Sequence, residues 1–217
     1  MATLESVQIG SVRREPEDPD RRLAEFTSAF GKTPVRGPVA VTPTRIEGDE
    51  FANSKAHGGV DKAVLCYGAK HYETTGENSL SSRFPDCDWS PGALGENWTI
   101  AGLSETNVCI GDIFAVGQTR VQVSQPRQPC WKINRFHRHP KLLKFISETG
   151  RTGWYLRVLQ TGSVQAGDAV RLEQRIHPDW PIARLNDFLF GRQVDLAGTM
   201  QLMAIDELAN AWKDAIA

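Results

Sequence analysis

Residues 107–123 read NVCIGDIFAVGQTRVQV, and this stretch decides the class of fold. Two runs rich in β-branched and aromatic residues flank Gly117 and Gln118, a pair that is typical of a tight turn. The pattern predicts a β-hairpin with Val121 and Val123 on the same side, because side chains alternate along a strand.

The chain on either side of this hairpin has the same character from about residue 7 to residue 173. Residues 154–159 (WYLRVL) form another β-rich run, and residues 164–172 predict a further strand–turn–strand unit. Many short strands favour a mainly β fold built as a closed or nearly closed barrel, since closure removes unpaired strand edges. We expect only a few flanking helices, over about 69–75 and 140–149, the latter ended by Gly150.

From residue 178 onward the pattern changes to apolar residues at helical spacing. We therefore divide the chain into a β-barrel domain, residues 1–176, and a C-terminal helical extension of two or three helices, residues 177–217. An extension of this size is too small to be stable alone, so it should pack on the barrel or on a partner.

The composition excludes several classes of protein. The 217 residues include 25 Lys and Arg against 26 Asp and Glu, and 40% are hydrophobic. This balance is typical of a globular protein and not of a disordered or nucleic-acid-coating one, so we expect no nucleic-acid partner. The sequence contains no apolar run long enough to cross a membrane and no apolar run suited to a signal peptide, which predicts a cytoplasmic protein without a membrane partner.

The four cysteines are too far apart for an iron–sulfur or zinc motif. Cys66 and Cys109 have apolar neighbours, which predicts buried thiols without a chemical role. Cys87 lies between two aspartates, which predicts a loop thiol with a raised pKa. Cys130 is left as the candidate for chemistry.

A first polar segment, SKAHGGVDKAV at residues 54–64, precedes an apolar strand. Paired glycines let backbone N–H groups approach an anion closely, and lysines supply positive charge, so the segment suits a phosphate or a similar group. A Gly-Gly turn with solvated charges is the alternative. The candidate residues are Lys55, His57, Gly58, Gly59, Asp61 and Lys62.

A second segment, QPRQPCWKINR, follows the hairpin at residues 125–135. Two prolines stiffen it, and Arg127, Lys132 and Arg135 surround Cys130 with positive charge. Positive charge favours a thiolate, which is a nucleophile or a ligand for a soft metal. A structural cysteine in a buried loop is the alternative.

The third segment, PGALGENW at residues 91–98, is weak evidence by itself. Glu96 and Asn97 supply a carboxylate and an amide, which could bind a ligand or cap a turn.

Together, the strings SKAHGGVDKAV, PGALGENWTIAGLSETNVCIGD, VSQPRQPCWKI and TGWYLRVLQTGSVQAGD resemble the MOSC domain (molybdenum cofactor sulfurase C-terminal type), in its YiiM-like branch. The resemblance covers about residues 45–173, and the tail is similar to the three-helix extension of that branch. Val60 departs from the pattern, because many relatives have proline after the paired glycines.

The resemblance implies a β-barrel that holds the molybdenum cofactor, a pterin dithiolene (molybdopterin) with a phosphate tail, and Cys130 as the protein ligand of the metal. It implies an oxidoreductase that reduces N-hydroxylated compounds, such as 6-hydroxylaminopurine, to amines in a detoxification role. On this basis we assign Lys55, Lys62 and Arg127, with the Gly58-Gly59 turn, to cofactor oxygens. Asn97 or Asn134 would then bond to the pterin.

Proton delivery would fall to His57 or Asp61, with His57 favoured because its ordinary pKa is near neutral. A turn histidine bonded to a backbone carbonyl is the alternative. Trp131 and Arg135 could border the substrate opening, or Trp131 could simply pack on the protein. Electrons would come from a separate flavin or iron–sulfur reductase, since the sequence has neither a nucleotide fingerprint nor clustered cysteines. A homodimer is left open.

Two other classes of function remain. The protein could carry the cofactor, or sulfur as a Cys130 persulfide, without turning over a substrate. Alternatively, it could be a cofactor-free cysteine enzyme that uses His57 or His137 as its base.

Overall fold

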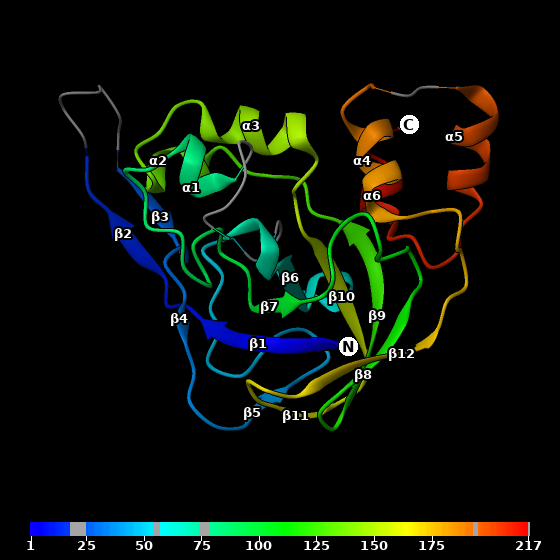
Figure 1. The fold of residues 1–217 in the computed structure, drawn as a ribbon, viewed down its shortest axis with the longest axis horizontal. Helices are drawn as coiled ribbons and strands as arrows, with labels where there is room; N and C mark the ends of the chain where they lie inside the picture. Colours follow the sequence, from blue (N-terminus) through cyan, green and yellow to red (C-terminus); the bar gives the residue numbers. More distant parts are fainter. Residues whose placement is uncertain (18–24, 54–56, 74–78, 193–194, 217) are drawn as a thin grey trace.

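The computed structural model describes residues 1–17, 25–53, 57–73, 79–192 and 195–216. Seven strands form a closed barrel in which every neighbouring pair is antiparallel except β6 and β7 (Figure 1). Their order around the barrel is β12 (Ala169–Gln174), β8 (Ile113–Val116), β9 (Thr119–Pro126), β10 (Trp154–Gln160), β6 (Val64–Gly68), β7 (Trp98–Ala101) and β1 (Ala2–Ile9). Ala2 of β1 lies opposite Val170 of β12 and closes the sheet, which confirms the predicted barrel.

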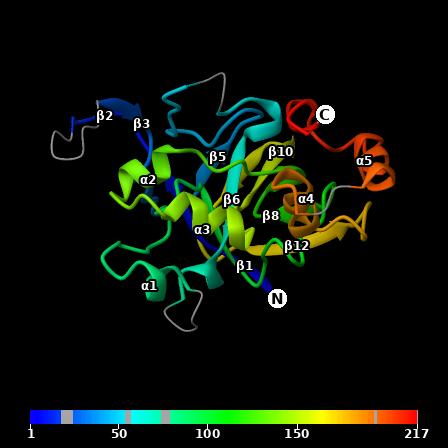
Figure 2. The same cartoon turned by 90° about the horizontal axis from the view of Figure 1, so that it is seen from above.

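Short strands are added outside the barrel. One of them, β4 (Thr33–Pro34), pairs with the end of β1. The other pairs are the two-stranded sheets β2–β3 (Arg13–Glu15 and Phe26–Ser28) and β5–β11 (Val39–Val41 and Gly162–Val164). The β2–β3 hairpin projects from the side of the molecule that carries α2, as both views show (Figures 1 and 2).

The predicted hairpin is present as β8 and β9, and Val121 and Val123 are both fully buried in the barrel core. Its turn requires glycine at position 117. The backbone there has a φ of 53°, and a Cβ atom would lie 2.6 Å from the carbonyl oxygen of Ser163.

The predicted strand–turn–strand unit over 164–172 is present as β11 and β12, but its two strands do not pair with each other. Both strands exist, but β11 pairs with β5, whereas β12 pairs with β8 and β1. The turn between them is held by β1 instead, because Leu4 exchanges backbone hydrogen bonds with Gly167 and Asp168. The turn between β11 and β12 is therefore held by β1, which is distant in sequence, and not by pairing between β11 and β12.

Helices flank the barrel on one side and follow it at the C-terminus (Figure 2). The predicted helix over 140–149 is α3 (Leu142–Thr149), and Gly150 ends it with a φ of 67°. The expected helix over 69–75 is only a 3₁₀ turn, η3 (Ala69–His71), and its far end lies outside the described residues. The remaining short helices are η2 (Val60–Lys62), α1 (Leu80–Arg83) and α2 (Lys132–Phe136), none of which the sequence analysis anticipated.

The C-terminal extension contains α4 (Ile182–Leu189), α5 (Leu196–Met203) and α6 (Asn210–Lys213). It packs on the barrel, since buried side chains such as Leu185 and Trp212 belong to the same hydrophobic core as the strand residues. Backbone hydrogen bonds from Ile182 to Val108 and from Ala209 to Ser124 fix it there. The division at residue 176 stays a prediction, because one core is continuous across it.

The cysteines behave largely as their neighbours suggested. Cys66 is fully buried and Cys109 nearly so. The pKa of the Cys87 thiol is raised, first by burial and then by the charge of Asp86.

Candidate functional site

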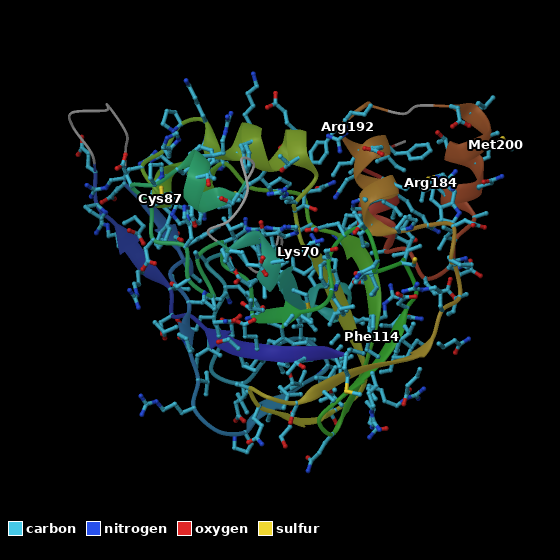
Figure 3. The ribbon with its side chains drawn as sticks, in the orientation of Figure 1. Lys70, Cys87, Phe114, Arg184, Arg192 and Met200 are labelled. Carbon is cyan, nitrogen blue, oxygen red and sulfur yellow. The ribbon has the colours of Figure 1, made fainter. Side chains whose placement is uncertain are left out.

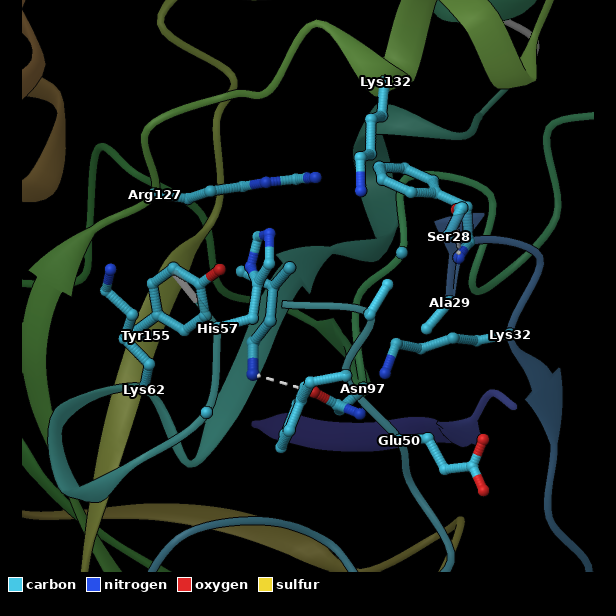
Figure 4. A pocket seen from close by; sticks show the side chains of 16 residues that line it. Ser28, Ala29, Lys32, Glu50, His57, Lys62, Asn97, Arg127, Lys132 and Tyr155 are labelled. Carbon is cyan, nitrogen blue, oxygen red and sulfur yellow. Dashed lines mark hydrogen bonds between the residues drawn. The ribbon is translucent and has the colours of Figure 1, made fainter. Parts of the chain in front are cut away.

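An open cleft lies on the outer side of β6 and β10 (Figure 4). Alternation along these strands explains its position. Val64 and Cys66 on β6 point into the barrel core, whereas Leu65 faces the cleft. On β10, Trp154 is in the core and Tyr155 lines the cleft. The cleft encloses about 570 Å³, part of it open to solvent.

Four cationic side chains converge on this cleft: Lys32, Lys62, Arg127 and Lys132. His57 lies among them, and its pKa is lowered from 6.5 to about 4, first by burial and then by these four charges, Arg127 foremost. These cations outnumber the Glu50 carboxylate that also lines the cleft, which favours an anionic ligand.

Arg127 is the strongest indication that this cleft binds a ligand. The residue is only 4% exposed, and its Nη1 atom is buried without a hydrogen-bond partner among the described residues. Its side chain extends across the cleft between Tyr155 and Lys132 (Figure 4). Because buried polar groups in folded proteins are nearly always paired, a free donor on a residue that lines the cleft favours a ligand with an acceptor oxygen.

Lys32 is held at the cleft by a buried network. Its ammonium group pairs with the carboxylate of Asp49, which also accepts hydrogen bonds from the backbone N–H of Gly10 (2.8 Å) and from Nδ2 of Asn97 (2.9 Å). The Oδ1 atom of Asn97 accepts from the N–H of Leu65 at 3.1 Å. Burial lowers the pKa of Lys32, and the charge of Asp49 opposes this effect.

Of the paired glycines, Gly58 lines the cleft and Gly59 does not. Gly58 has a φ of 77°, and a Cβ atom there would lie 2.5 Å from the ring of Phe51. Gly59 has a φ of 86° but open space around it. Both positions therefore favour glycine for its backbone freedom, and Gly58 also for its lack of a side chain.

Cys130 lies beside the cleft and does not line it. It is partly buried, and both Arg127, three residues before it, and Lys132, two residues after it, face the cleft. Burial is the main reason that the pKa of the Tyr155 hydroxyl, which lines the cleft, is raised, and the charge of Arg127 opposes this effect.

The structure brings together only some of the residues that the sequence analysis selected. Those that line the cleft are His57, Gly58, Lys62, Asn97 and Arg127. Asp61 instead pairs with Arg157, with 2.7 Å between Oδ1 and Nη2. Asn134 uses both side-chain polar atoms in the α2–α3 connection, with Leu143 N–H and the Pro140 carbonyl. Lys55 lies outside the described residues.

The surroundings of Asn97, Glu96 and His57 bear on the roles expected for them. The amide of Asn97 is fully occupied by Leu65, Gln8 and Asp49, so it shapes the cleft from within the protein. Glu96 accepts a hydrogen bond from Gly92 N–H at 2.7 Å and therefore caps its own turn, as the structural alternative held. The ordinary pKa that favoured His57 as an acid does not apply, because the imidazole is neutral at pH 7.

The sequence analysis missed Lys32 and Tyr155. Strand alternation on residues 154–159 could have identified Tyr155, since the core-facing Trp154 and Leu156 flank it. No local signal marks Lys32, which reaches the cleft through its pairing with Asp49.

Comparison with known proteins establishes the class of this chain. The MOSC domain family matches residues 53–171, and the YiiM-like, 3-alpha helix domain matches residues 180–217. The chain therefore belongs to the MOSC domain family. Within it, YiiM of Escherichia coli is 37% identical over 151 residues, covering 69% of this chain and 65% of YiiM.

Other relatives agree. YflK of Bacillus subtilis is 36% identical over 182 residues, covering 84% of this chain and 80% of YflK. A Gibberella moniliformis protein named a reductase is 40% identical over 174 residues, 79% of this chain but only 30% of that protein's length. The crystal structure of YiiM from Geobacillus stearothermophilus is 32% identical, with a TM-score of 0.80 over the full length of both chains.

Two features are absent from the described residues. These residues contain no group of three or more His, Cys, Asp or Glu side chains that could hold a metal ion. No helix among them is both long enough and apolar enough to span a membrane.

Proposed function

We propose that this protein is a molybdenum-cofactor-dependent reductase that converts N-hydroxylated compounds to amines. The observation that carries the proposal is the buried Nη1 of Arg127, which has no partner among the described residues, in a cleft of four cations beside Cys130. The family supports the cofactor, and the Gibberella relative named a reductase supports the class of reaction.

The side chains present fit this cofactor. Arg127, Lys62, Lys132 and Lys32 supply charge and donors for phosphate and pterin oxygens, and the Gly58-Gly59 turn gives room for close approach. Cys130 supplies the soft thiolate ligand that molybdenum favours. A single protein ligand suffices, because the dithiolene of the cofactor brings its own sulfur atoms.

When bound, the cofactor supplies the two electrons that, with two protons, convert R–NHOH to R–NH₂ and water. The residues of the chain position the reactants and handle protons. With its lowered pKa, His57 is a neutral imidazole that accepts or donates a hydrogen bond. An anion bound nearby would raise this pKa and allow His57 to hold a second proton. The Tyr155 hydroxyl keeps its proton at neutral pH and can donate to a polar group of a ligand in the cleft.

Electrons would reach the site from a separate flavin or iron–sulfur reductase in the cytoplasm. The chain spans 30% of the length of the Gibberella reductase, so that protein has room for further domains.

The deciding measurement is molybdenum content after expression in a host that makes the cofactor. Wild-type protein should contain near-stoichiometric metal, and Cys130→Ser should lose most of it. Cys87→Ser is the matched control, since Cys87 is also partly buried and lies in a different cleft with His137. Figure 3 shows Cys87 on the side of the molecule that carries α1 and α2.

Each outcome separates the candidate functions. Metal retained by Cys130→Ser would contradict the ligand assignment. Wild-type protein that holds metal but reduces no N-hydroxylated compound with a chemical reductant would be a carrier. Activity that is sensitive to alkylation in metal-free protein would instead support a cysteine enzyme.

A further inference from the structure

The indole of Trp131 is half exposed, at 51%, although it directly follows Cys130. A large aromatic side chain on the surface does not need explanation by itself. Its surroundings are unusual, however, because two cations and a second aromatic ring hold it in place.

Phe26 packs against Trp131 with 5.5 Å between ring centroids and a 55° angle between the planes. The Arg135 guanidinium lies 4.8 Å from the Phe26 centroid and 5.8 Å from that of Trp131. Lys132 lies 6.0 and 5.9 Å from the same two centroids. Such cation–π contacts orient the two rings as one rigid unit.

Neither ring lines the cleft, but Lys132, which contacts both rings, does. Lys132, the neighbour of Trp131, lines the cleft, and its Nζ donates a hydrogen bond to the carbonyl of Thr27 at 2.7 Å. Ser28, two residues after Phe26, also lines it. The α2 and β3 segments are thus joined at the edge of the cleft, and Trp131 directly follows Cys130 in the chain.

We propose that Trp131, braced by Phe26 and Arg135, is a platform that stacks the planar ring of the substrate. The proposal rests on the proposed function and specifies its substrate class as N-hydroxylated aromatic and heteroaromatic compounds. Stacking reads only the π-face of a ring, so purine, pyrimidine and benzene derivatives should all be accepted. Small aliphatic hydroxylamines gain nothing from the platform.

The first test compares kcat/KM of the molybdenum-loaded enzyme for 6-hydroxylaminopurine and for N-methylhydroxylamine, with reduced methyl viologen as electron donor. Trp131→Ala should lower the purine value about 5- to 150-fold, the equivalent of the ~1–3 kcal/mol that stacking one base contributes. The value for N-methylhydroxylamine should change less than about twofold. Trp131→Phe should recover much of the loss, because it keeps an aromatic face.

The control is Leu196→Ala, which removes a still more exposed apolar side chain from α5, on the side of the molecule away from α2 (Figure 1). It should affect neither substrate. Equal losses for both substrates in Trp131→Ala would indicate a structural role and overturn the proposal, as would no loss for the purine.

A second measurement does not depend on turnover. The chain has six tryptophans, and the indole N–H signal of Trp131 in a ¹H–¹⁵N spectrum is the one missing from Trp131→Phe. Millimolar adenine, the amine product of the purine substrate, should shift that signal. If it shifts while wild-type protein reduces nothing, the platform stands and the proposed function fails; if it does not shift, the platform is refuted.

Discussion

The buried Lys32–Asp49 pair offers a quantitative test of how the cleft is supported. Asp49 is 2% exposed and receives three donors: Lys32, Gly10 N–H and Asn97 Nδ2. Asp49→Ala would leave the Lys32 ammonium buried without its counterion, at a side-chain exposure of 7%. Breaking a buried pair in this way costs about 3–5 kcal/mol.

Removing the cation of this pair should destabilise the protein less than removing the carboxylate. Lys32→Met leaves Asp49 with two of its three donors, so we expect a loss well below that of Asp49→Ala. The double variant Lys32→Met/Asp49→Leu should lose less stability than the sum of the single changes, because neither charge is then left alone.

Urea unfolding at pH 7, followed by tryptophan fluorescence, gives all three free energies of unfolding. For a chain of this size, the expected loss in Asp49→Ala corresponds to a fall in Tm of about 6–20 °C. A loss below about 1 kcal/mol, or strictly additive effects in the double variant, would refute the account of a coupled buried pair.

Two further predictions concern the wall of the cleft. Gly58→Ala should destabilise the protein by about 1–2 kcal/mol because the backbone there is left-handed, and further because the Phe51 ring must move. Gly59→Ala should show the backbone effect alone, since the space around it is open. Thermal melts of the two variants measure the difference. His57 should titrate near 4 by NMR in the free protein, and added inorganic phosphate should raise that pKa. Since the unfolded chain takes up this proton near pH 6.5 and the folded protein only near 4, stability should fall as the pH drops through that window, and His57→Gln should reduce the dependence. A His57 pKa that ignores phosphate would contradict an anion site.

Much of the fold could be predicted from the sequence, because its signals are local. The β8–β9 hairpin depends on a turn that only glycine fits, and α3 ends at a glycine in the left-handed conformation. The pairing of β11 with β5 could not be predicted, since it depends on which distant strand lies alongside.

The candidate site likewise has features that the sequence predicts and features that it does not. By itself, the sequence determined the barrel class, the helical extension, and the two segments that bring Gly58, His57, Lys62 and Arg127 to one cleft. These follow from periodicity, from glycine and proline positions, and from clustered charge, all of which are properties of neighbouring residues.

Only the tertiary structure decided which polar side chains remain available. It occupied Asn97 and Asp61 with internal partners, brought Lys32 and Tyr155 into the cleft, and lowered the pKa of His57. Burial and long-range charge set these properties, and both depend on residues far apart in the chain, so no local pattern records them.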